Sequence, residues 1–197
     1  VTPDFVVIGE PSNMKVYRGH KGRIEMEVSC KGISAHAASN YMGENAVYKM
    51  LPVIDAISKM EKDFVPHEFL GQGRVTVTQV RTSAPSVNAV PDKCTIFVDR
   101  RVTFGESQAY WRKALEDLIP EQYKDDFEVK QLIYSDPSHT GAVYEYESYF
   151  PAWALEEDHP FVQAGVATMK ALWGSEDPFG QGKWDFSTNG NYWVGKL

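Results

Sequence analysis

The sequence predicts an α+β fold. It contains a βαββαβ unit, a four-stranded antiparallel sheet with two helices on one face, inserted into a second domain to which the first and last parts of the chain belong. Two observations predict this. Four strand-like segments and two helix-like segments follow one another in the order β-α-β-β-α-β. The stretches before and after this unit carry strand and helix patterns of their own, which indicates a second domain interrupted by the first.

The strand predictions depend on period-two alternation. Residues 22–32 (GRIEMEVSCKG), 73–82 and 93–102 alternate between apolar and polar side chains, and residues 127–135 (FEVKQLIYS) form the fourth strand of the unit. Residues 4–10 (DFVVIGE) are instead a short continuous apolar run, which is typical of a parallel strand buried on both faces. A loop rich in Pro, Ser and Asn (SAPSVNAVPD) separates the second strand of the unit from the third.

The helix predictions depend on apolar residues at helical spacing. Residues 43–64 carry this spacing, with Pro52 inside the helix, where it is expected to cause a kink. Residues 105–120 form a second helix that ends at Pro120, and a third helix begins with Pro160 at its first position. Between the unit and this third helix the chain is Tyr-rich and irregular. The predicted division is residues 1–21 for the end of one segment of the second domain, 22–135 for the inserted unit, and 136–197 for the start of the other segment.

Composition and charge exclude several classes of function. The chain has 197 residues, 43% of them hydrophobic, which is enough for a sizeable core. Its net charge of −7 and its pI near 5.2 disfavour a surface for nucleic acid or anionic membranes. No apolar run reaches membrane-spanning length, and no signal peptide is evident. The chain begins without Met and closes on NYWVGKL with no recognisable terminal helix, so we expect a piece of a longer protein.

The two cysteines, Cys30 and Cys94, both lie in predicted strands. Without a CxxC spacing they make neither a zinc ribbon nor a thioredoxin-type motif. Two buried, reduced thiols in the cytoplasm are the expected state. His20, in RGHKG, is expected in a turn, His139 in a loop, and His159 at a helix start. Because the histidines are scattered, a metal site made of histidines alone is not predicted.

Several residues could carry chemistry, each with a structural alternative. His36, in GISAHAAS, stands among small residues after a strand, where its imidazole could bind metal, transfer protons or donate to a reacting oxygen, or simply face water. Glu10 ends the apolar run 4–10 and could bind a divalent metal or cap the next turn. Arg100 and Arg101 end a strand on opposite faces, and the one on the open face could clamp a carboxylate.

Two loops contribute further candidates. Asn88 stands in SVNAVPD, where Asn is common for conformational reasons alone. The segment FSTNG, residues 186–190, combines a turn signal with the hydroxyls of Ser187 and Thr188, so that turn and ligand interpretations both remain open. The acidic cluster of residues 156–158 is interpreted as a helix-capping feature.

Taken in order, VVIGEPS, GHKGRIEMEVSCKGISAHAA, GENAV, NAVPDKCTIFVDRR and WDFSTNG resemble the zinc-dependent exopeptidase and deacylase family. That family includes acetylornithine deacetylase, succinyl-diaminopimelate desuccinylase, aminoacylase and carboxypeptidase G. Through VYRGHKGR, DRRVTFGE, YFPAWALEEDH and KWDFSTNG the chain is most similar to the branch of hydrolases associated with selenium metabolism. Each motif is weak alone, and the ordered set covers essentially the whole chain.

The resemblance implies a βαββαβ lid, which also dimerises, inserted in an α/β zinc-peptidase-like catalytic domain. It implies a metal-activated water that cleaves an amide bond of a small, carboxylate-bearing substrate, in a cytoplasmic homodimer joined through the lid. Glu10 would be one ligand of a two-metal site, with zinc expected and cobalt or manganese as alternatives. His36 would reach into the partner's active site and contact the oxygen that becomes negative in the transition state. Asn88, Arg101, Ser187 and Thr188 would bind the substrate.

The chain also departs from the family's pattern. No proline follows His36 within HAASNYMGENA, and Ser187-Thr188-Asn189-Gly190 replaces the usual Gly-Thr-Asp-Ala turn. The family's His-x-Asp, Glu-Glu and terminal His are not in this chain, so most metal ligands would lie outside it. The alternative function is a non-catalytic βαββαβ module for dimerisation or ligand binding. A serine or cysteine hydrolase is disfavoured because the chain has no G-x-S-x-G motif.

Overall fold

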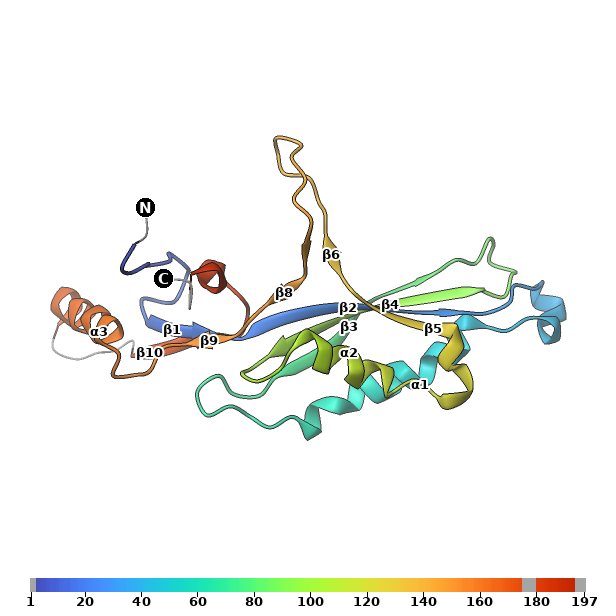
Figure 1. Ribbon diagram of the computed structural model, residues 1–197, viewed down its shortest axis with the longest axis horizontal. Helices are drawn as coiled ribbons and strands as arrows, with labels where there is room; N and C mark the ends of the chain where they lie inside the picture. The colour runs from blue at the N-terminus through green and yellow to red at the C-terminus, as the bar shows by residue number, and fades with distance from the viewer. Residues whose placement is uncertain (1–2, 175–179, 194–197) are drawn as a thin grey trace.

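The computed structural model describes residues 3–174 and 180–193, which form an elongated molecule whose two larger sheets are arranged end to end (Figure 1). The strands are β1 Val16–His20, β2 Gly22–Lys31, β3 Arg74–Thr82, β4 Lys93–Val102, β5 Phe127–Gln131, β6 Ile133–Tyr134, β7 Tyr146–Glu147, β8 Tyr149–Phe150, β9 Trp153–Ala154 and β10 Gln181–Trp184. The helices are α1 Ala46–Lys59, α2 Gln108–Glu116 and α3 Pro160–Trp173, with short 3-10 turns η1 Ala37–Met42, η2 Met60–Asp63, η3 Glu121–Asp126 and η4 Asn189–Tyr192.

The larger sheet has the order β3-β4-β2-β5, and every neighbouring pair is antiparallel. With α1 and α2 it forms the predicted βαββαβ unit, which is confirmed and is called the lid below. Strand β8 pairs with β2 at Arg23 and Ile24, so it extends the edge occupied by β5. The side-chain alternation predicted the lid well because one face of each strand is covered by helices and the other faces solvent.

One continuous core fills the space between the lid sheet and its two helices. The strands contribute every second residue of β2 and β4, and each helix contributes one apolar stripe. The fully buried members are Ile24, Met26, Val28, Cys30, Ala46, Met50, Val53, Ile57, Cys94, Ile96, Val98, Val102, Trp111 and Leu115. Asn45 caps α1 by accepting hydrogen bonds from the backbone N–H groups of Val47 and Tyr48 (2.9 and 3.4 Å). Pro52 lies inside α1, as predicted.

The smaller sheet has the order β10-β1-β9, with β1 parallel to β10 and antiparallel to β9. Only Lys21 separates β1 from β2, so the chain passes from one sheet into the other almost as one strand. The chain returns from the larger sheet to the smaller one between β8 and β9, next to the connection between β1 and β2. A Cβ at Gly22 would lie 2.4 Å from the carbonyl oxygen of Phe150, so glycine is required where the two crossings touch.

Two expectations from the sequence are wrong at this end of the molecule. Residues 4–10 form no strand: Phe5 and Val7 are 59% and 84% exposed, and the ladders of β1, β9 and β10 do not include them. A continuous apolar run becomes a buried strand only when neighbouring strands and helices cover both of its faces. His20 is not in a turn: it is the last residue of β1 and is fully buried, because the glycines around it allow close strand approach.

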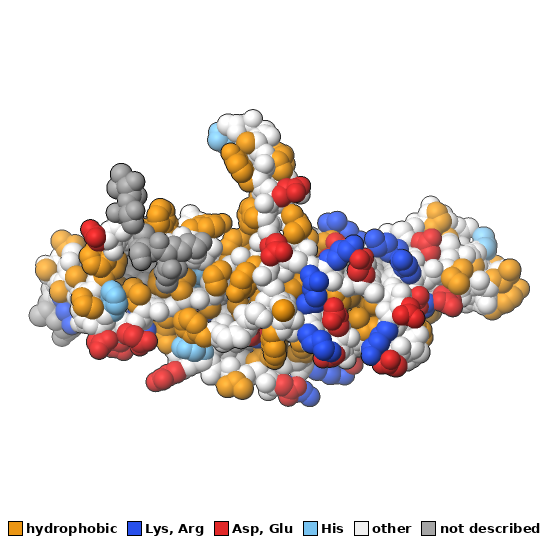
Figure 2. Space-filling model, in the orientation of Figure 1, with side chains coloured by type: hydrophobic (Ala, Val, Ile, Leu, Met, Phe, Trp, Pro, Cys, Tyr) orange, Lys and Arg blue, Asp and Glu red, His pale blue; other side chains and the backbone are white. Residues whose placement is uncertain are grey.

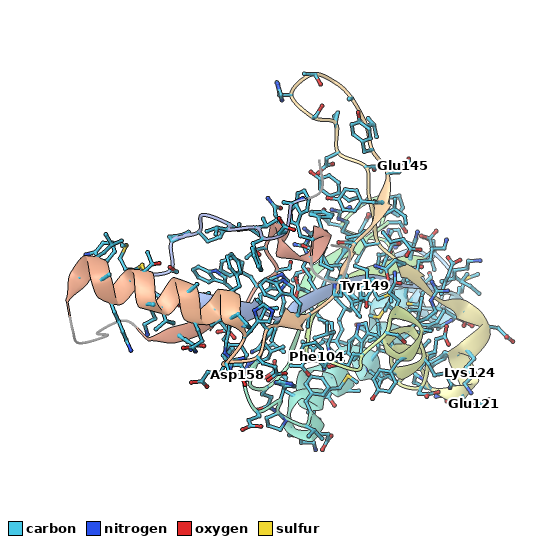
Figure 3. The ribbon with its side chains drawn as sticks, turned by 60° about the vertical axis from the view of Figure 1, so that its left-hand side comes forward. Phe104, Glu121, Lys124, Glu145, Tyr149 and Asp158 are labelled. Atoms are coloured by element: carbon cyan, nitrogen blue, oxygen red, sulfur yellow. The ribbon has the colours of Figure 1, made fainter. Side chains whose placement is uncertain are left out.

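A narrow arm, residues 133–148, stands away from the lid (Figure 1). Strands β6 and β7 pair at its base, where the rings of Tyr134 and Tyr146 pack with centroids 5.0 Å apart. Glu145 lies out on the arm, whereas Tyr149 lies where the chain rejoins the sheet (Figure 3). No helix of the described residues is long and apolar enough to cross a membrane.

Candidate functional site

His36 lies at the far end of the lid, which we call the tip and define as the loops 32–43 and 82–91. Backbone hydrogen bonds join these two loops: Ala37 N–H donates to the Asn88 carbonyl, and Val90 N–H donates to the Ala35 carbonyl, both at 2.8 Å. His36 is itself the N-terminal cap of η1. The backbone of His36 is therefore held in place, although its side chain is exposed.

The two loop residues predicted from separate motifs meet at this point. The imidazole Nδ1 of His36 accepts a hydrogen bond from the Ala38 backbone N–H at 3.1 Å. Its Nε2 lies 3.3 Å from the carboxamide Nδ2 of Asn88, a residue 52 positions away in the chain. Since Nδ1 is an acceptor, a neutral ring carries its proton on Nε2. In that tautomer the outer side of the ring presents an N–H donor to solvent, and this N–H donates to Asn88 only when the carboxamide oxygen, rather than the nitrogen, faces the ring.

Arg100 and Arg101 point to opposite faces of β4, as the sequence predicts. Arg100 is buried against the helices, where its guanidinium binds the Glu106 carboxylate (Nη2 to Oε1 2.6 Å) and stacks on Phe64 with its Cζ 3.6 Å from the ring centroid. Arg101 lies on the open face, where Nε and Nη2 donate to the two carboxylate oxygens of Asp99 at 2.7 and 3.0 Å. Asp99 thus orients the guanidinium of Arg101, and the Nη1 group is not used in that pair.

Within one chain, the tip and Arg101 are far apart. Lys31 of β2 pairs with Lys93 of β4 next to the tip, while Gly22 pairs with Val102 at the other end. Ten residues of strand span about 30 Å. The His36–Asn88 pair and Arg101 therefore lie at opposite ends of the lid sheet, and one chain cannot bring them to the same small substrate.

The remaining predicted residues belong to the end of the molecule that carries the smaller sheet. Ser187 and Thr188 follow β10 and are half-buried, and the Thr188 hydroxyl caps η4 by accepting from Gly190 N–H at 3.2 Å. Glu10 is half-buried in the segment before β1 and makes no hydrogen bond or ion pair with another described residue. Across residues 3–174 and 180–193, no three His, Cys, Asp or Glu side chains converge as a metal site would require.

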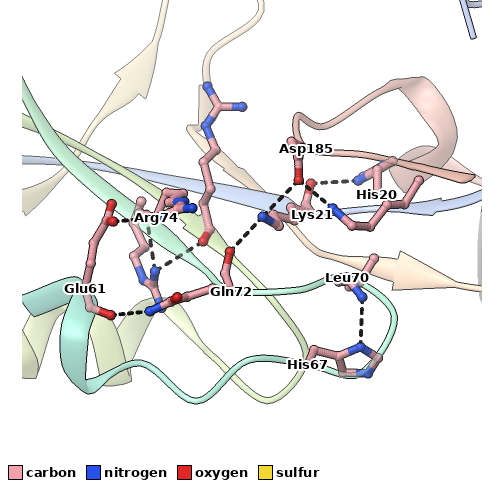
Figure 4. A network of polar contacts seen from close by, with 11 residues as sticks. His20, Lys21, Glu61, His67, Leu70, Gln72, Arg74 and Asp185 are labelled. Carbon is pink, nitrogen blue, oxygen red and sulfur yellow. Dashed lines mark hydrogen bonds and ion pairs between the residues drawn. The ribbon is translucent and has the colours of Figure 1, made fainter.

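A polar cluster around the buried Lys21 and His20 lies where the two sheets meet, and sequence reasoning missed it (Figure 4). The ammonium of Lys21, only 5% exposed, donates to the Gln72 carbonyl of the lid at 2.7 Å and lies 2.9 Å from the Asp185 carboxylate after β10. Beside it, burial lowers the pKa of the His20 imidazole, against the opposing effect of backbone carbonyls such as that of Lys21. The signal in the sequence was GHKG: two glycines flanking polar residues where strands approach closely.

Two shallow cavities among the described residues have linings that include none of the predicted site residues. One, of about 300 Å³, lies on the open sheet face against the base of the arm and is lined by Glu25, Phe97 and Asp99 among others. The other, of about 490 Å³, lies between the lid loop at Phe69 and α3 and is lined by Arg18 and Lys170 among others. The predicted site residues lie instead at the tip, at the end of β4 near the junction of the two sheets, and in the segments beside the smaller sheet.

Comparison with known proteins decides the family. Residues 18–126 match the model of the peptidase dimerisation domain, more than half of the chain. The chain belongs to this family. A 192-residue stretch is 39% identical to protein YgeY of Escherichia coli K12 and covers 96% of this chain and 46% of that protein. A stretch of 128 residues is 29% identical to a probable carboxypeptidase of Ajellomyces capsulatus, covering 59% of this chain and 29% of the relative.

Solved structures show the same fold at low sequence identity. A tripeptidase from Staphylococcus aureus superposes with a TM-score of 0.63 at 14% identity, over 90% of this chain and 42% of that one. The chain thus spans about half the length or less of the relatives it matches. The predicted family and lid are confirmed, while the selenium-associated branch stays a prediction.

Proposed function

We propose that the chain is the lid, with adjoining strands of the catalytic domain, of a dimeric, metal-dependent hydrolase that cleaves an amide bond in a small substrate bearing a carboxylate. The division into residues 1–21, 22–135 and 136–197 is part of this proposal, with β8 returning to the lid sheet before the chain crosses to β9. The family match and the peptidase named among the structural neighbours support it.

Glu10 is the only metal ligand that we assign to this chain. A tetrahedral zinc site takes three or four protein ligands, so one carboxylate does not hold the metal. The two divalent ions, with zinc proposed and cobalt or manganese as alternatives, would depend on residues outside this chain. The steps considered below are therefore those of the lid's own residues.

The lid offers an edge for a second copy of itself. β3 is an outer strand of the sheet, and no described strand pairs with its free side. Most of its residues are exposed, including Val80 at 53%. On the neighbouring helix α1, Tyr48 and Leu51 are 71% and 52% exposed, one turn apart. An unpaired strand edge beside an exposed apolar stripe is the kind of surface that strand pairing and helix packing between two copies would cover.

Strand direction supports a position of each tip near the partner's active site. Along β3, Arg74 pairs with Arg101 at one end and Thr82 pairs with Cys94, near the tip, at the other. If two copies pair antiparallel along β3 about a twofold axis, the Thr82 end of one chain lies against the Arg74 end of its partner. The tip of each lid would thus come close to the partner's Arg101 end and its smaller sheet. The separation of the tip from Arg101 within one chain is the observation that carries this proposal.

In this arrangement His36 would donate its Nε2–H to the carbonyl oxygen of the amide held in the partner subunit. This hydrogen bond becomes stronger as negative charge develops on the carbonyl oxygen, so it stabilises the transition state more than the ground state. Asn88 would place the ring and contact the same group. Arg101, oriented by Asp99, would hold the substrate carboxylate through its free Nη1, with Ser187 and Thr188 beside it.

The test uses two inactive variants of the full-length, metal-loaded protein. His36→Ala should lower turnover by roughly a hundredfold to a thousandfold, as the loss of one oxyanion donor does. Glu10→Ala should be inactive through loss of metal. When the two are mixed under conditions of subunit exchange, about half of the dimers are heterodimers and each holds one complete site. Activity should therefore return to about a quarter of the wild-type value.

The control replaces His36→Ala by His139→Ala, which changes an exposed histidine of the arm and should keep full activity before mixing. If the His36→Ala and Glu10→Ala mixture recovers nothing while its subunits are shown to exchange, His36 serves its own subunit and the proposed action in trans is wrong. If the full-length wild-type protein binds no metal and cleaves no amide, the chain is instead a non-catalytic dimerisation module.

A further inference from the structure

The tip carries no charged residue. Neither Gly32–Gly43 (GISAHAASNYMG) nor Thr82–Pro91 (TSAPSVNAVP) contains Asp, Glu, Lys or Arg. The nearest charges in the chain are Lys31, Glu44, Arg81 and Asp92, at the outer ends of these loops. Asp92 accepts a hydrogen bond from the Ser83 hydroxyl. The donor at Nε2 of His36 is thus surrounded by neutral groups on both loops.

The open face of the sheet, behind the tip, is different. At its far end the register aligns Arg23, Arg101 and Arg74 in one row across three strands, and Glu25 and Asp99 in the next. Figure 2 shows charged side chains gathered over the middle of the molecule, whereas the tip at its right-hand end is covered mainly by uncharged and hydrophobic groups and one histidine. Charge is therefore distributed unevenly along the lid.

Apolar side chains also stand out from the tip. Val87, directly before Asn88, is fully exposed, and Tyr41 and Met42 in η1 are 83% and 69% exposed. Ala37 and Ala38 follow His36 in the chain and Ala89 pairs with it in a backbone bridge, while the Ser86 hydroxyl, which donates to the Asn88 carboxamide, is a neutral polar group on the same loop. A ligand contacting Nε2 of His36 would therefore meet neutral groups on this side, namely alkyl and aromatic side chains and the Asn88 carboxamide.

We infer that the tip selects substrates whose acyl group carries no charge. This rests on the proposed function: His36 contacts the carbonyl oxygen, and the acyl group is attached to that carbonyl carbon. The substrate carboxylate, on the amine side of the amide, is proposed to bind Arg101 of the subunit that holds the substrate. The tip that contacts the acyl group comes from the other subunit. An acidic acyl group would lose its water against Val87 and its neighbours, and would find no counter-charge on the tip. A neutral alkyl or aryl acyl group has no charge to desolvate, so contact with the tip carries no such penalty.

The test measures kcat/KM of the full-length, metal-loaded protein on two derivatives of one amino acid, N-valeryl and N-succinyl. The five carbons of the valeryl chain reach as far as the four carbons and one carboxylate oxygen of the succinyl chain, and only the succinyl group ends in a charge. Wild type should prefer the valeryl derivative by at least about tenfold. Val87→Lys should raise the succinyl-to-valeryl ratio by about tenfold at low salt, and less at high salt because ions screen the new charge. Val87→Gln, a neutral control of similar size, should leave the ratio nearly unchanged.

A wild-type preference for the succinyl derivative would overturn the inference. So would a Val87→Lys ratio no different from that of Val87→Gln, and Met42→Lys provides a second position for the same comparison. These outcomes leave the proposed function intact, because turnover has been observed. Failure to hydrolyse either derivative, or any other acyl amino acid or peptide, would instead contradict the proposed function itself.

Discussion

The lid and the segments that flank it, residues 3–20, 151–174 and 180–193, are built from similar residue types but pack very differently. In the lid, sheet and helices follow one another in the chain and close a core whose central residues are fully buried. In the flanking segments, Phe5, Val7 and Leu172 are 59%, 84% and 65% exposed. Apolar residues form a core only where the apolar faces of neighbouring elements cover each other. In the lid, the sheet and its two helices do this within one continuous stretch of chain.

The largest expected effect concerns this difference in local stability. Amide hydrogens of β2 and β4 should exchange with solvent at least about a thousandfold more slowly than those of β1 and β10, because opening the lid core exposes far more apolar surface. Hydrogen exchange followed by mass spectrometry measures this on the intact chain. A polypeptide of residues 22–150 should keep the slow exchange of β2 and β4. Equal exchange in both sheets would contradict the comparison.

The next effect separates the buried and open faces of one strand. Arg100→Lys should destabilise the chain by roughly 3 kcal/mol or more. Lysine keeps the positive charge but loses the paired hydrogen bonds from the guanidinium to the Glu106 carboxylate and the stacking on the Phe64 ring. Arg101→Lys, at a partly exposed pair, should cost about 1 kcal/mol or less. Urea unfolding at pH 7 gives both values. In the full-length protein Arg101→Lys should instead raise KM, and an unchanged KM would remove Arg101 from the proposed carboxylate site.

A matched pair of leucines tests the packing of helices in the two regions. Leu115→Ala in α2 removes a fully buried side chain and should cost about 2–5 kcal/mol. Leu172→Ala in α3 removes one that is 65% exposed and should change the free energy of unfolding by about 0.5 kcal/mol at most. Both are measured by urea unfolding of the same chain. A large cost at Leu172 would show that α3 is covered in solution, for example by a second copy.

The smallest effect is a pH dependence at the junction of the two sheets. Burial lowers the folded-state pKa of His20 below its ordinary value of 6.5. The unfolded chain therefore binds a proton first as pH falls below 6.5, and the free energy of unfolding decreases from there down to the folded-state pKa. Urea unfolding at pH 7.5 and 5.5 should show this loss, and His20→Gln should reduce it. The exposed His139→Gln should behave like wild type.

The lid was predictable because its pattern is local and repeated. Alternation in residues 22–32 and 93–102, with helical spacing in 43–64, specified elements whose order allows few topologies. The run 4–10 looked equally strand-like, yet forms no strand, since burial on two faces depends on neighbours that sequence pattern does not reveal. His20 was misplaced for a similar reason: glycines that suggest a turn also allow two strands to touch.

The sequence by itself determined which residues could act: His36 among small neighbours, Asn88 in its loop, an arginine on each face of β4, and two loops without charge. Only the tertiary structure decided where these residues lie, because two residues 52 positions apart meet only when β2 and β4 pair in one register. That register brings the His36 ring to Asn88, where the Ala38 backbone N–H sets the proton on Nε2. It also places Arg101 about 30 Å away, since strand length accumulates with every residue.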